Sequence, residues 1–451
     1  MASSDLRIVR FSIALSEETY RIPFTLSSGT ITSITYAKVT VEAENRSNAR
    51  AKGYGDVLLS VLWSFPDPAL SYDAKDRAMR LLLEKIGEFI VSVGEFLDPL
   101  QLAEMTDREL ERLMGETEKE LNFPVAIPRL CGIVCGSAFD AAIHDAWAAA
   151  CGLSAYRMYN ADYLNEDLSR YLGAGWAGKY PQQFLVPPRK QLSVQHVIGG
   201  LDPLTSGDAG FESGLVAGDW PVTLEQWIVK EGLRWFKVKL KGSDAAWDFQ
   251  RIVDVYEVAA SVMNRRSGEM RVNLSLDPNE ACATPEPIME TLLKLKVDYP
   301  EVFAAVRYVE QPTPRDLDSY NFTLHELARI KPVIVDESLD HIGKLNQVEE
   351  QGWSGIALKT GRGHSQSLLA YCWAKQNRRY LTMQDLTNPG RALIHSANLC
   401  SHLAMDIEAF EHNSRQYIPH SGETALHEYP GIQWVREGRI NLSEVKHLGL
   451  Y

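Results

Sequence analysis

The sequence has no hydrophobic run long enough to cross a lipid bilayer. A membrane-spanning helix needs about 18 or more consecutive apolar residues, and no uncharged stretch of this chain approaches that length. The first residues, MASSDLRIVRFSIALSEE, also lack the basic head and apolar core of a secretory signal peptide. We therefore expect a cytoplasmic protein with no membrane partner.

Cysteine is scarce, and the sequence contains no C-x-x-C pair. The six cysteines are scattered through apolar segments. This spacing is typical of buried free thiols in a reducing compartment and argues against disulfides or a zinc site, which are the alternatives. The residues are Cys131, Cys135, Cys151, Cys282, Cys372 and Cys400.

Basic residues are outnumbered by acidic ones. The 451 residues include 46 Lys and Arg against 59 Asp and Glu, which gives a net charge of -13 at pH 7. Nucleic acids and anionic membranes are bound through basic patches, so this balance argues against both as partners. It is compatible with a small anionic substrate, because a few lysines or a metal ion can reverse the field inside one pocket.

The first third of the chain has the pattern of an α+β unit. Residues 6–60 contain strand-like runs and end in Gly53-Tyr54-Gly55-Asp56, which we interpret as a turn. Helical patterns follow at 73–93 and 107–121. Because the length favours two domains, we predict an N-terminal α+β capping domain of residues 1–135.

Two further segments complete this organisation. An alanine-rich helix at 136–152 is apolar on most faces, so we expect it to be buried. Residues 156–190 are rich in tyrosine and break the pattern, which we interpret as an insertion or lid-like loop. We expect residues 420–451 to pack back on the capping domain.

From about residue 192 the chain alternates between strand-like and helical segments. Eight strand candidates occur, most of them separated by 10 to 20 residues with helical spacing. This rhythm indicates parallel strands joined by crossover helices. Eight such strands close a (β/α) barrel of the TIM type, which we place at residues 136–419; an open doubly wound sheet is the alternative. The candidates are QLSVQHVI, WFKVKLKG, MRVNLSLD, AAVRYVEQ, KPVIVDE, SGIALKT, RYLTMQD and MDIEAFEH.

Six of the predicted strands end in ionisable residues. Successive ends lie 38, 33, 26, 23 and 26 residues apart, about one strand–helix unit each. Parallel barrel strands point their carboxyl ends to one face, where barrel enzymes keep their active sites. One such residue could simply cap a helix, but six in register, two of them lysines, are not explained by capping. They are Lys239, Asp277, Glu310, Asp336, Lys359 and Asp385.

The three carboxylates Asp277, Glu310 and Asp336 stand at adjacent strand ends. Three like charges at close range repel unless a cation lies between them. Oxygen ligands without histidine or cysteine favour a hard ion, so we predict that they bind Mg²⁺, with Mn²⁺ as a substitute. The alternative is that salt bridges to arginines or to the neighbouring lysines neutralise them.

Three lysines indicate which proton-transfer chemistry to expect beside this ion. Lys237 and Lys239 alternate along one strand and so point to the same side, where each should lower the pKa of the other. Lys359 should reach the pocket from the opposite side. A partly neutral lysine is a competent base, and two lysines can remove a proton from one face of a carbon and return it to the other. The alternative is a solvated edge strand, which fits Lys241.

The parts together indicate a reaction class. A proton beside a carboxylate is too weakly acidic for an amine base unless the enediolate is stabilised, and a divalent ion on the carboxylate supplies that stabilisation. Pairing a lysine base with magnesium is the pattern of the enolase superfamily, which is itself a standard example of this chemistry.

Several motifs resemble that superfamily. FKVKLKG, LDPNE, VEQP, VDES and ALKTG are similar to signatures of its muconate-lactonising and dipeptide-epimerase branch, in the same order and at barrel-like intervals. The run that ends in GYGD and the segment SAFDAAIHDAWAAACGLSAYRMY resemble the capping domain and the helix that leads into the barrel. The resemblance covers most of the chain and implies a modified (β/α)7β-like barrel with a capping domain, assembled as a homo-oligomer.

The resemblance also implies roles. Asp277, Glu310 and Asp336 would bind magnesium, Lys239 and Lys359 would be the acid/base pair, and Lys237 would tune Lys239 and contact the substrate carboxylate. Supporting or substrate-binding positions would be Asn279, Glu337, Asp385 and Glu411. The implied function is a racemase, epimerase or cycloisomerase acting on a small carboxylate.

Departures from the family pattern leave the substrate open. Gly361-Arg362-Gly363 replaces a glycine pair, and the eighth strand EAFEHNS lacks the paired aspartates of dipeptide epimerases, so we do not expect a dipeptide. We expect specificity to be set at Phe24–Thr30, at Asp56–Ser60 and near Glu411.

Three further side chains lie outside the expected site. We expect His364 and His395 to be surface or loop histidines. Arg415 is a candidate partner for a distal anionic group, although an ordinary surface arginine explains it better.

Other functions stay open on the sequence alone. A leaving group on the β-carbon would turn the same chemistry into an acid-sugar dehydratase. From other classes, Lys239 or Lys359 could serve a Schiff-base aldolase, which leaves the carboxylates unexplained. Gly361-Arg362-Gly363 is a weak nucleotide-binding motif, because its third glycine is missing. A barrel that binds a ligand without catalysis is also compatible.

Overall fold

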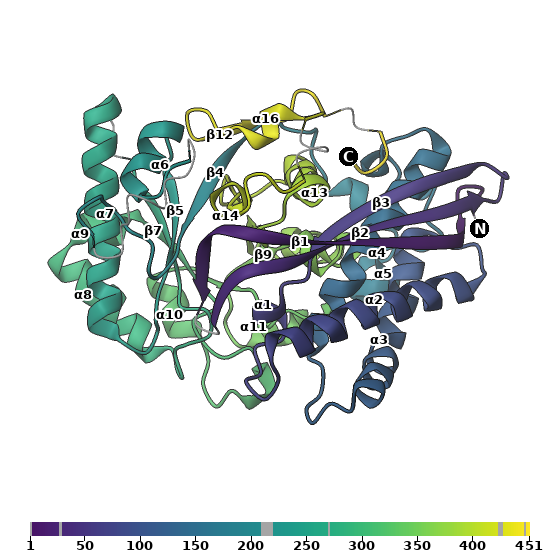
Figure 1. Ribbon diagram of the computed structural model, residues 1–451, viewed down its shortest axis with the longest axis horizontal. Helices are drawn as coiled ribbons and strands as arrows, with labels where there is room; N and C mark the ends of the chain where they lie inside the picture. The colour runs from purple at the N-terminus through teal and green to yellow at the C-terminus, as the bar shows by residue number, and fades with distance from the viewer. Residues whose placement is uncertain (1, 27–28, 209–219, 269–270, 423–426, 446–447) are drawn as a thin grey trace.

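The computed structural model describes residues 2–26, 29–208, 220–268, 271–422, 427–445 and 448–451. Figure 1 shows two parts: long antiparallel strands with helices near the N-terminus, and a helix-wrapped barrel. Within these ranges, no helix combines the length and the apolar character that a bilayer crossing requires. All six cysteines are free thiols, five of them buried, as predicted.

The N-terminal part is a three-stranded antiparallel sheet covered by helices. Strands β1 (Leu6–Leu26), β2 (Gly29–Asn45) and β3 (Arg50–Leu58) pair in sequence order. The helices are α1 (Val61–Ser64), α2 (Tyr72–Val93), α3 (Pro99–Leu121) and α4 (Arg129–Cys151). Helix α3 begins eight residues before the predicted 107, because Asp98 accepts a hydrogen bond from the backbone of Gln101 and Pro99 occupies the first turn.

The predicted turn at Gly53-Tyr54-Gly55-Asp56 is wrong, because these residues lie inside β3. The two glycines serve packing instead. A Cβ atom on Gly53 would lie 1.9 Å from the carbonyl oxygen of Ala142, and one on Gly55 would lie 2.0 Å from that of Ala138. The backbone of α4 therefore rests directly on β3. By these contacts α4 packs on the N-terminal sheet, and the predicted domain limit at residue 135 falls inside this helix.

Eight parallel strands among the described residues close the predicted barrel, and strand β11 pairs with β4 to complete it. This closure excludes an open doubly wound sheet. The strands are β4 (Gln191–Ile198), β5 (Trp235–Lys239), β6 (Asn273–Asp277), β7 (Val306–Glu310), β8 (Val333–Val335), β9 (Gly355–Leu358), β10 (Tyr380–Met383) and β11 (Ala409–Glu411). All eight strand candidates from the sequence are confirmed.

Helices surround this barrel (Figure 1). They are α6 (Leu224–Glu231), α7 (Ala245–Ser267), α8 (Glu286–Asp298), α9 (Pro300–Ala305), α10 (His325–Ile330), α11 (Leu345–Glu350), α12 (His364–Gln376), α13 (Gly390–Ser401), α14 (Ser414–Tyr417) and α16 (Pro430–Gln433). The short strand β12 (Arg439–Asn441) pairs antiparallel with β4, whereas the backbone N–H of Leu450 donates to Asp145 on α4. The C-terminal segment thus contacts both parts.

Residues 156–190 form short helical turns, including α5 (Ser169–Leu172), that pack against the rest of the chain. Tyr156 and Tyr159 are buried, and the hydroxyl of Tyr159 contacts His144 on α4. None of these residues lines the small cavity at the strand ends described below. Arg170 and Tyr171 of this segment line a larger cavity instead, and the insertion or lid-like interpretation stays a prediction.

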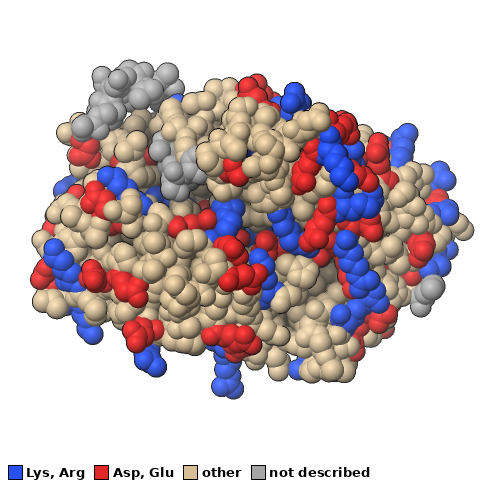
Figure 2. All heavy atoms as spheres, turned by 90° about the horizontal axis from the view of Figure 1, so that it is seen from below, with Lys and Arg blue, Asp and Glu red and all other residues tan. Residues whose placement is uncertain are grey.

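Charged side chains of both signs are interspersed on the surface. Figure 2 shows Lys and Arg next to Asp and Glu over one face, without a continuous basic area among the residues it colours. This distribution agrees with the acidic composition.

Candidate active site

The ionisable residues predicted at the strand ends converge on the carboxyl-terminal mouth of the barrel. Lys239, Asp277 and Glu310 are the last residues of β5, β6 and β7, and Asp336 and Lys359 directly follow β8 and β9. Lys239 and Asp277 are paired in register across the two strands. All except Lys239, which is partly exposed, are buried. The structure thus brings the predicted set together.

Two lysines of β5 contact the carboxylates on one side of the mouth. The Nζ atom of Lys237 lies 2.9 Å from Oε1 of Glu310, 2.5 Å from Oε2 of Glu411 and 3.8 Å from Oδ2 of Asp277. The Nζ atom of Lys239 lies 2.5 Å from the same Asp277 oxygen. Lys237 therefore joins the third and fourth strands of the barrel to the eighth.

The carboxylates outweigh the effect of burial on these lysines. Burial lowers the pKa of Lys237, but Glu310, Glu411 and Asp277 raise it well above its ordinary value. Burial and Lys237 likewise lower the pKa of Lys239, and the charge of Asp277 more than offsets them. The expectation that the lysine pair would have lowered pKa values is therefore wrong for the contacts in this structure, because each ammonium has an acidic partner.

Lys359 approaches from the other side. Its Nζ atom donates to Oδ2 of Asp336 and lies 4.8 Å from the ring centre of Trp63, which comes from α1 in the N-terminal part. Arg362 binds the other oxygen of Asp336 at 2.8 Å. Burial raises the pKa of Asp336, but Lys359 and Arg362 lower it to about 2. Asp336 is thus held ionised.

Glu310 lies between Asp277 and Asp336. Burial raises its pKa, Lys237 lowers it, and the charges of the two neighbouring aspartates raise it further, to about 7 in all. The amide of Gln384 donates to Oε2 of Glu310. The part of this rise that comes from Asp277 and Asp336 is one that a bound cation would offset.

The acids at the mouth are not arranged as a preformed metal site. Among the described residues, no three Asp, Glu, His or Cys side chains are arranged around one point as metal ligands are. The acids contact lysines and Arg362 instead, as the salt-bridge alternative predicted. Their chemistry nevertheless fits a hard divalent ion: three buried carboxylates at adjacent strand ends repel one another, and Oε2 of neighbouring Glu337 is buried without a hydrogen-bond partner.

Asn279 and Glu337 contact the row of acids and each other. The backbone N–H of Asn279 donates to Oδ1 of Asp277 at 2.9 Å, and its side-chain amide lies 3.3 Å from Oε1 of Glu337. The indole N–H of Trp63 donates to the same Glu337 oxygen at 2.9 Å. Glu337 is thus hydrogen-bonded to Trp63 of α1, and Asn279 links Glu337 to Asp277.

A cavity of about 50 Å³ adjoins these groups. Lys237, Lys239, Lys359, Asp385 and Glu411 reach it from the barrel. Strands β1 and β2 cover it with Tyr20, Phe24, Ile31 and Ile34, and Ser60 and Trp63 complete this side. The predicted specificity segments thus contribute Phe24 and Ser60; residues 27–28 lie outside the described residues.

Asp385 differs from the other acids of the mouth. Oδ1 accepts hydrogen bonds from the backbone N–H groups of Leu386 and Asn388, whereas Oδ2 is buried without a partner. Burial, together with the charge of Glu411, raises its pKa to about 8. At neutral pH Asp385 is mainly a protonated acid on the wall of the cavity.

Three expectations about single residues are wrong. His364 and His395 are buried, and Nδ1 of His364 lies 2.9 Å from Nε2 of His395. Arg415 is also buried, because Glu231 accepts hydrogen bonds from its guanidinium. Sequence reasoning missed two residues of the site, Trp63 and Gln384. Arg362 also belongs to the site, and its place between two glycines shortly after Lys359 is a signal in the sequence for it.

The chain was compared with known proteins. No protein-family model and no curated protein sequence matches it significantly. Solved structures do match. A muconate lactonizing enzyme from Pseudomonas fluorescens is 16% identical with a TM-score of 0.58, over 98% of this chain and 95% of that one. A mandelate racemase/muconate lactonizing protein from Herpetosiphon aurantiacus is 17% identical with a TM-score of 0.60, over 98% and 97%.

A dipeptide epimerase from Enterococcus faecalis V583, solved with Mg and the dipeptide L-Leu-L-Tyr, is 17% identical with a TM-score of 0.58, over 98% of this chain and 99% of that one. These matches span nearly the whole chain, at identities that establish the fold and not the reaction. The protein has the enolase-type fold of the muconate lactonizing enzymes and dipeptide epimerases, which confirms the predicted resemblance at the level of the fold.

Proposed function

We propose that this protein is a magnesium-dependent enzyme that removes the proton next to a carboxylate, as a racemase, epimerase or cycloisomerase. One observation carries the proposal. Lys239 and Lys359 stand at opposite ends of the row Asp277, Glu310 and Asp336, each bonded to the acid at its own end. A substrate carbon held over this row would have one amine on either side.

The chain's own residues divide the work. Lys239 takes the proton from one face of the carbon, and Lys359 returns it to the other, or protects that face in a cycloisomerisation. Lys237, fixed by Glu310 and Glu411, binds the substrate carboxylate. Magnesium, when held by Asp277, Glu310 and Asp336, would replace the lysines as the counter-charge of these acids and draw charge from the substrate carboxylate. Manganese would serve the same purpose.

The proposal is tested by proton exchange in heavy water with magnesium. The substrates are a pooled library of acid sugars, N-acyl amino acids, dipeptides and cyclic carboxylates, followed by mass spectrometry. We expect one substrate class to gain one mass unit with the native protein and none with Lys239→Ala. Lys241→Ala is the matched control, since Lys241 is exposed two residues further on, and it should exchange normally. Exchange that persists in both Lys239→Ala and Lys359→Ala would refute the two-lysine mechanism.

A second candidate, an acid-sugar dehydratase, is favoured by Asp385. Loss of a β-hydroxyl needs a proton donor beside the lysines, and the protonated Asp385 carboxyl lines the same cavity as Lys239 and Lys359. Asp385→Asn should then stop water loss and leave α-proton exchange intact. If exchange and water loss fall together in this variant, Asp385 is not the donor.

We also propose that the protein is cytoplasmic and assembles as a homo-oligomer. An aldolase is disfavoured because Schiff-base chemistry at Lys239 or Lys359 leaves the row Asp277, Glu310 and Asp336 without a role.

A further inference from the structure

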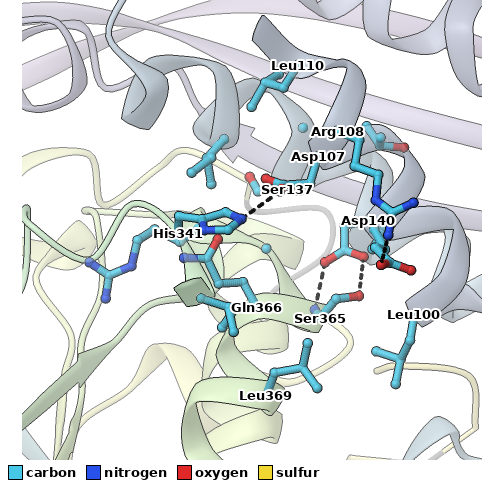
Figure 3. A pocket seen from close by; sticks show the side chains of 18 of the residues that line it. Leu100, Asp107, Arg108, Leu110, Ser137, Asp140, His341, Ser365, Gln366 and Leu369 are labelled. Atoms are coloured by element: carbon cyan, nitrogen blue, oxygen red, sulfur yellow. Dashed lines mark hydrogen bonds and ion pairs between the residues drawn. The ribbon is translucent and has the colours of Figure 1, made fainter. Parts of the chain in front are cut away.

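A cavity of about 460 Å³ lies between the N-terminal part and the barrel, apart from the strand-end lysines. Helices α3 and α4 form one wall and the loops after β8 and β9, with α12, form the other (Figure 3). None of the three lysines and three acids of the proposed mechanism lines it. Apolar residues dominate the walls, among them Leu100, Leu110, Ile133, Phe139, Ile342 and Leu369.

The charged side chains on the wall are paired with one another or with groups behind them. Nε2 of His341 lies 3.1 Å from Oδ2 of Asp107. Asp140 accepts hydrogen bonds from the backbone and the hydroxyl of Ser365, both at 2.7 Å (Figure 3). Glu104 pairs with Arg108 and Arg170 at the rim, and Arg362 is engaged by Asp336. The cavity therefore presents apolar surface, with its arginines paired with acids and Asp140 hydrogen-bonded to Ser365.

A glycine keeps this cavity open. Gly136 lies within α4 and lines the cavity, and a Cβ atom added to it would meet no atom within 4 Å. One turn earlier, Gly132 is required by packing, because a Cβ there would lie 2.8 Å from Sδ of Met114. Glycine is a poor helix former, so a glycine that packing does not require is unfavourable for α4 itself. At Gly136 the absence of a side chain leaves this part of the cavity wall open.

We propose that this cavity binds an uncharged, mainly apolar small molecule. Pockets for such ligands have volumes of about 300 to 1,000 Å³, with apolar walls and a few polar groups that set orientation, as found here. An anionic ligand would need an unpaired cation, which the described lining does not offer, and Asp140 already accepts two hydrogen bonds from Ser365. Because Arg362 lies on the wall and holds Asp336, the bound molecule would also border the row of acids. The proposal stands without the magnesium chemistry, since binding needs no turnover.

The test uses 4-bromobenzyl alcohol as the probe. Isothermal titration of the native protein should give saturable binding at one site. Gly136→Leu should weaken it at least tenfold by filling the cavity. Gly115→Leu is the matched control: Gly115 is a glycine of α3 with equally open space that does not line the cavity, and binding should be unchanged. Ala103→Met, on the neighbouring helix α3 of the same wall, is a second filling variant should Gly136→Leu not fold.

Location and ligand class are tested in the crystal. The anomalous signal of bromine should lie between α4 and the loop that follows β9. The proposal is overturned by a bromine site beside Lys239, by unsaturable binding, or by unchanged affinity in both filling variants. It is equally overturned if 4-bromobenzoate occupies the cavity as tightly as the alcohol, or if probe binding disappears as the protein self-associates, which would assign the surface to a second copy of the chain.

Discussion

The guanidinium of Arg362 and the carboxylate of Asp336 form a buried ion pair next to the row of strand-end acids. Nη1 of Arg362 lies 2.8 Å from Oδ1 of Asp336 and 2.7 Å from the carbonyl oxygen of the same residue, and Nη2 donates to the carbonyl of Ala357. These contacts fasten the loop after β9 to the end of β8. Lys359 holds the other oxygen of Asp336, so cations engage both sides of this acid.

Removing this guanidinium should be costly. Arg362→Met leaves the Asp336 carboxylate with one cation fewer in a buried place, and such a loss typically costs about 3–5 kcal/mol. We expect the free energy of unfolding, measured by urea denaturation, to fall by about that amount. Arg108→Met is the control, because Arg108 is exposed and its ion pair with Glu104 lies at the surface, and it should change stability by less than about 0.5 kcal/mol. Equal losses would contradict the role of the buried pair.

Glu310→Gln should weaken metal binding. The amide keeps the shape of the side chain but removes one of the three negative charges that repel one another at the strand ends. Substituting residues that only hold a metal ligand in place typically lowers metal affinity about 10–100-fold. Substituting a residue that binds the metal directly should therefore lower it at least tenfold. Titration with Mn²⁺ followed by electron paramagnetic resonance measures this. Glu408→Gln, at an exposed glutamate before β11, should bind Mn²⁺ normally. An unchanged isotherm for Glu310→Gln would argue against the metal site.

The barrel and its mouth could be predicted from the sequence because they follow from periodicity. Parallel strands return at regular intervals, and every strand ends at the same face, so Lys239, Asp277 and Glu310 had to meet. The position of a residue along a strand therefore fixed its place in space. The order of the strands along the chain was sufficient to predict that these three residues meet.

Partners that come from loops and helices could not be predicted in the same way. Trp63 reaches Glu337 and Lys359 from the N-terminal part. No spacing pattern in the sequence predicts a contact between residues so far apart. Burial of Arg415 depends on Glu231, far away on α6. A charged residue is normally expected at the surface, so its buried partner must be known before its place can be. The pKa values of Lys237 and Lys239 follow the same rule: they are raised by acidic partners on other strands, which the sequence of β5 alone does not reveal.

The glycines of β3 should be intolerant of any side chain. A Cβ atom on Gly55 would lie 2.0 Å from the carbonyl oxygen of Ala138, so Gly55→Ala must push α4 away from the sheet. Forced overpacking typically lowers stability by about 1–3 kcal/mol or more. Gly115→Ala is the control in open space and should raise stability by up to about 1 kcal/mol, because alanine favours the helix. A neutral Gly55→Ala in urea denaturation would refute the close approach.

Buried histidines form a chain of hydrogen bonds between α4, α12 and α13. Nε2 of His395 lies 2.9 Å from Nδ1 of His364, and Nε2 of His364 lies 2.8 Å from the hydroxyl of Tyr159. That hydroxyl also lies 2.9 Å from Nδ1 of His144, whose Nε2 is 2.8 Å from Oγ of Ser365. Ser365 donates to Asp140, so one direction of donation satisfies the whole chain with neutral histidines.

This chain should make the protein sensitive to mild acid. Burial lowers the pKa of His395 to about 3, whereas an unfolded histidine titrates near 6.5 (about the model-peptide value). Between these values the unfolded chain binds the extra proton, so the stabilisation is complete above about pH 6.5 and is lost as pH falls, at about 1.4 kcal/mol per pH unit. From pH 7 to pH 5 the contribution of His395 is therefore about 2 kcal/mol. His395→Gln should remove that dependence, whereas exposed His325→Gln should keep it. Urea denaturation at both pH values measures the difference, and an equal loss in the native protein and His395→Gln would show that His395 is not kept neutral by the fold.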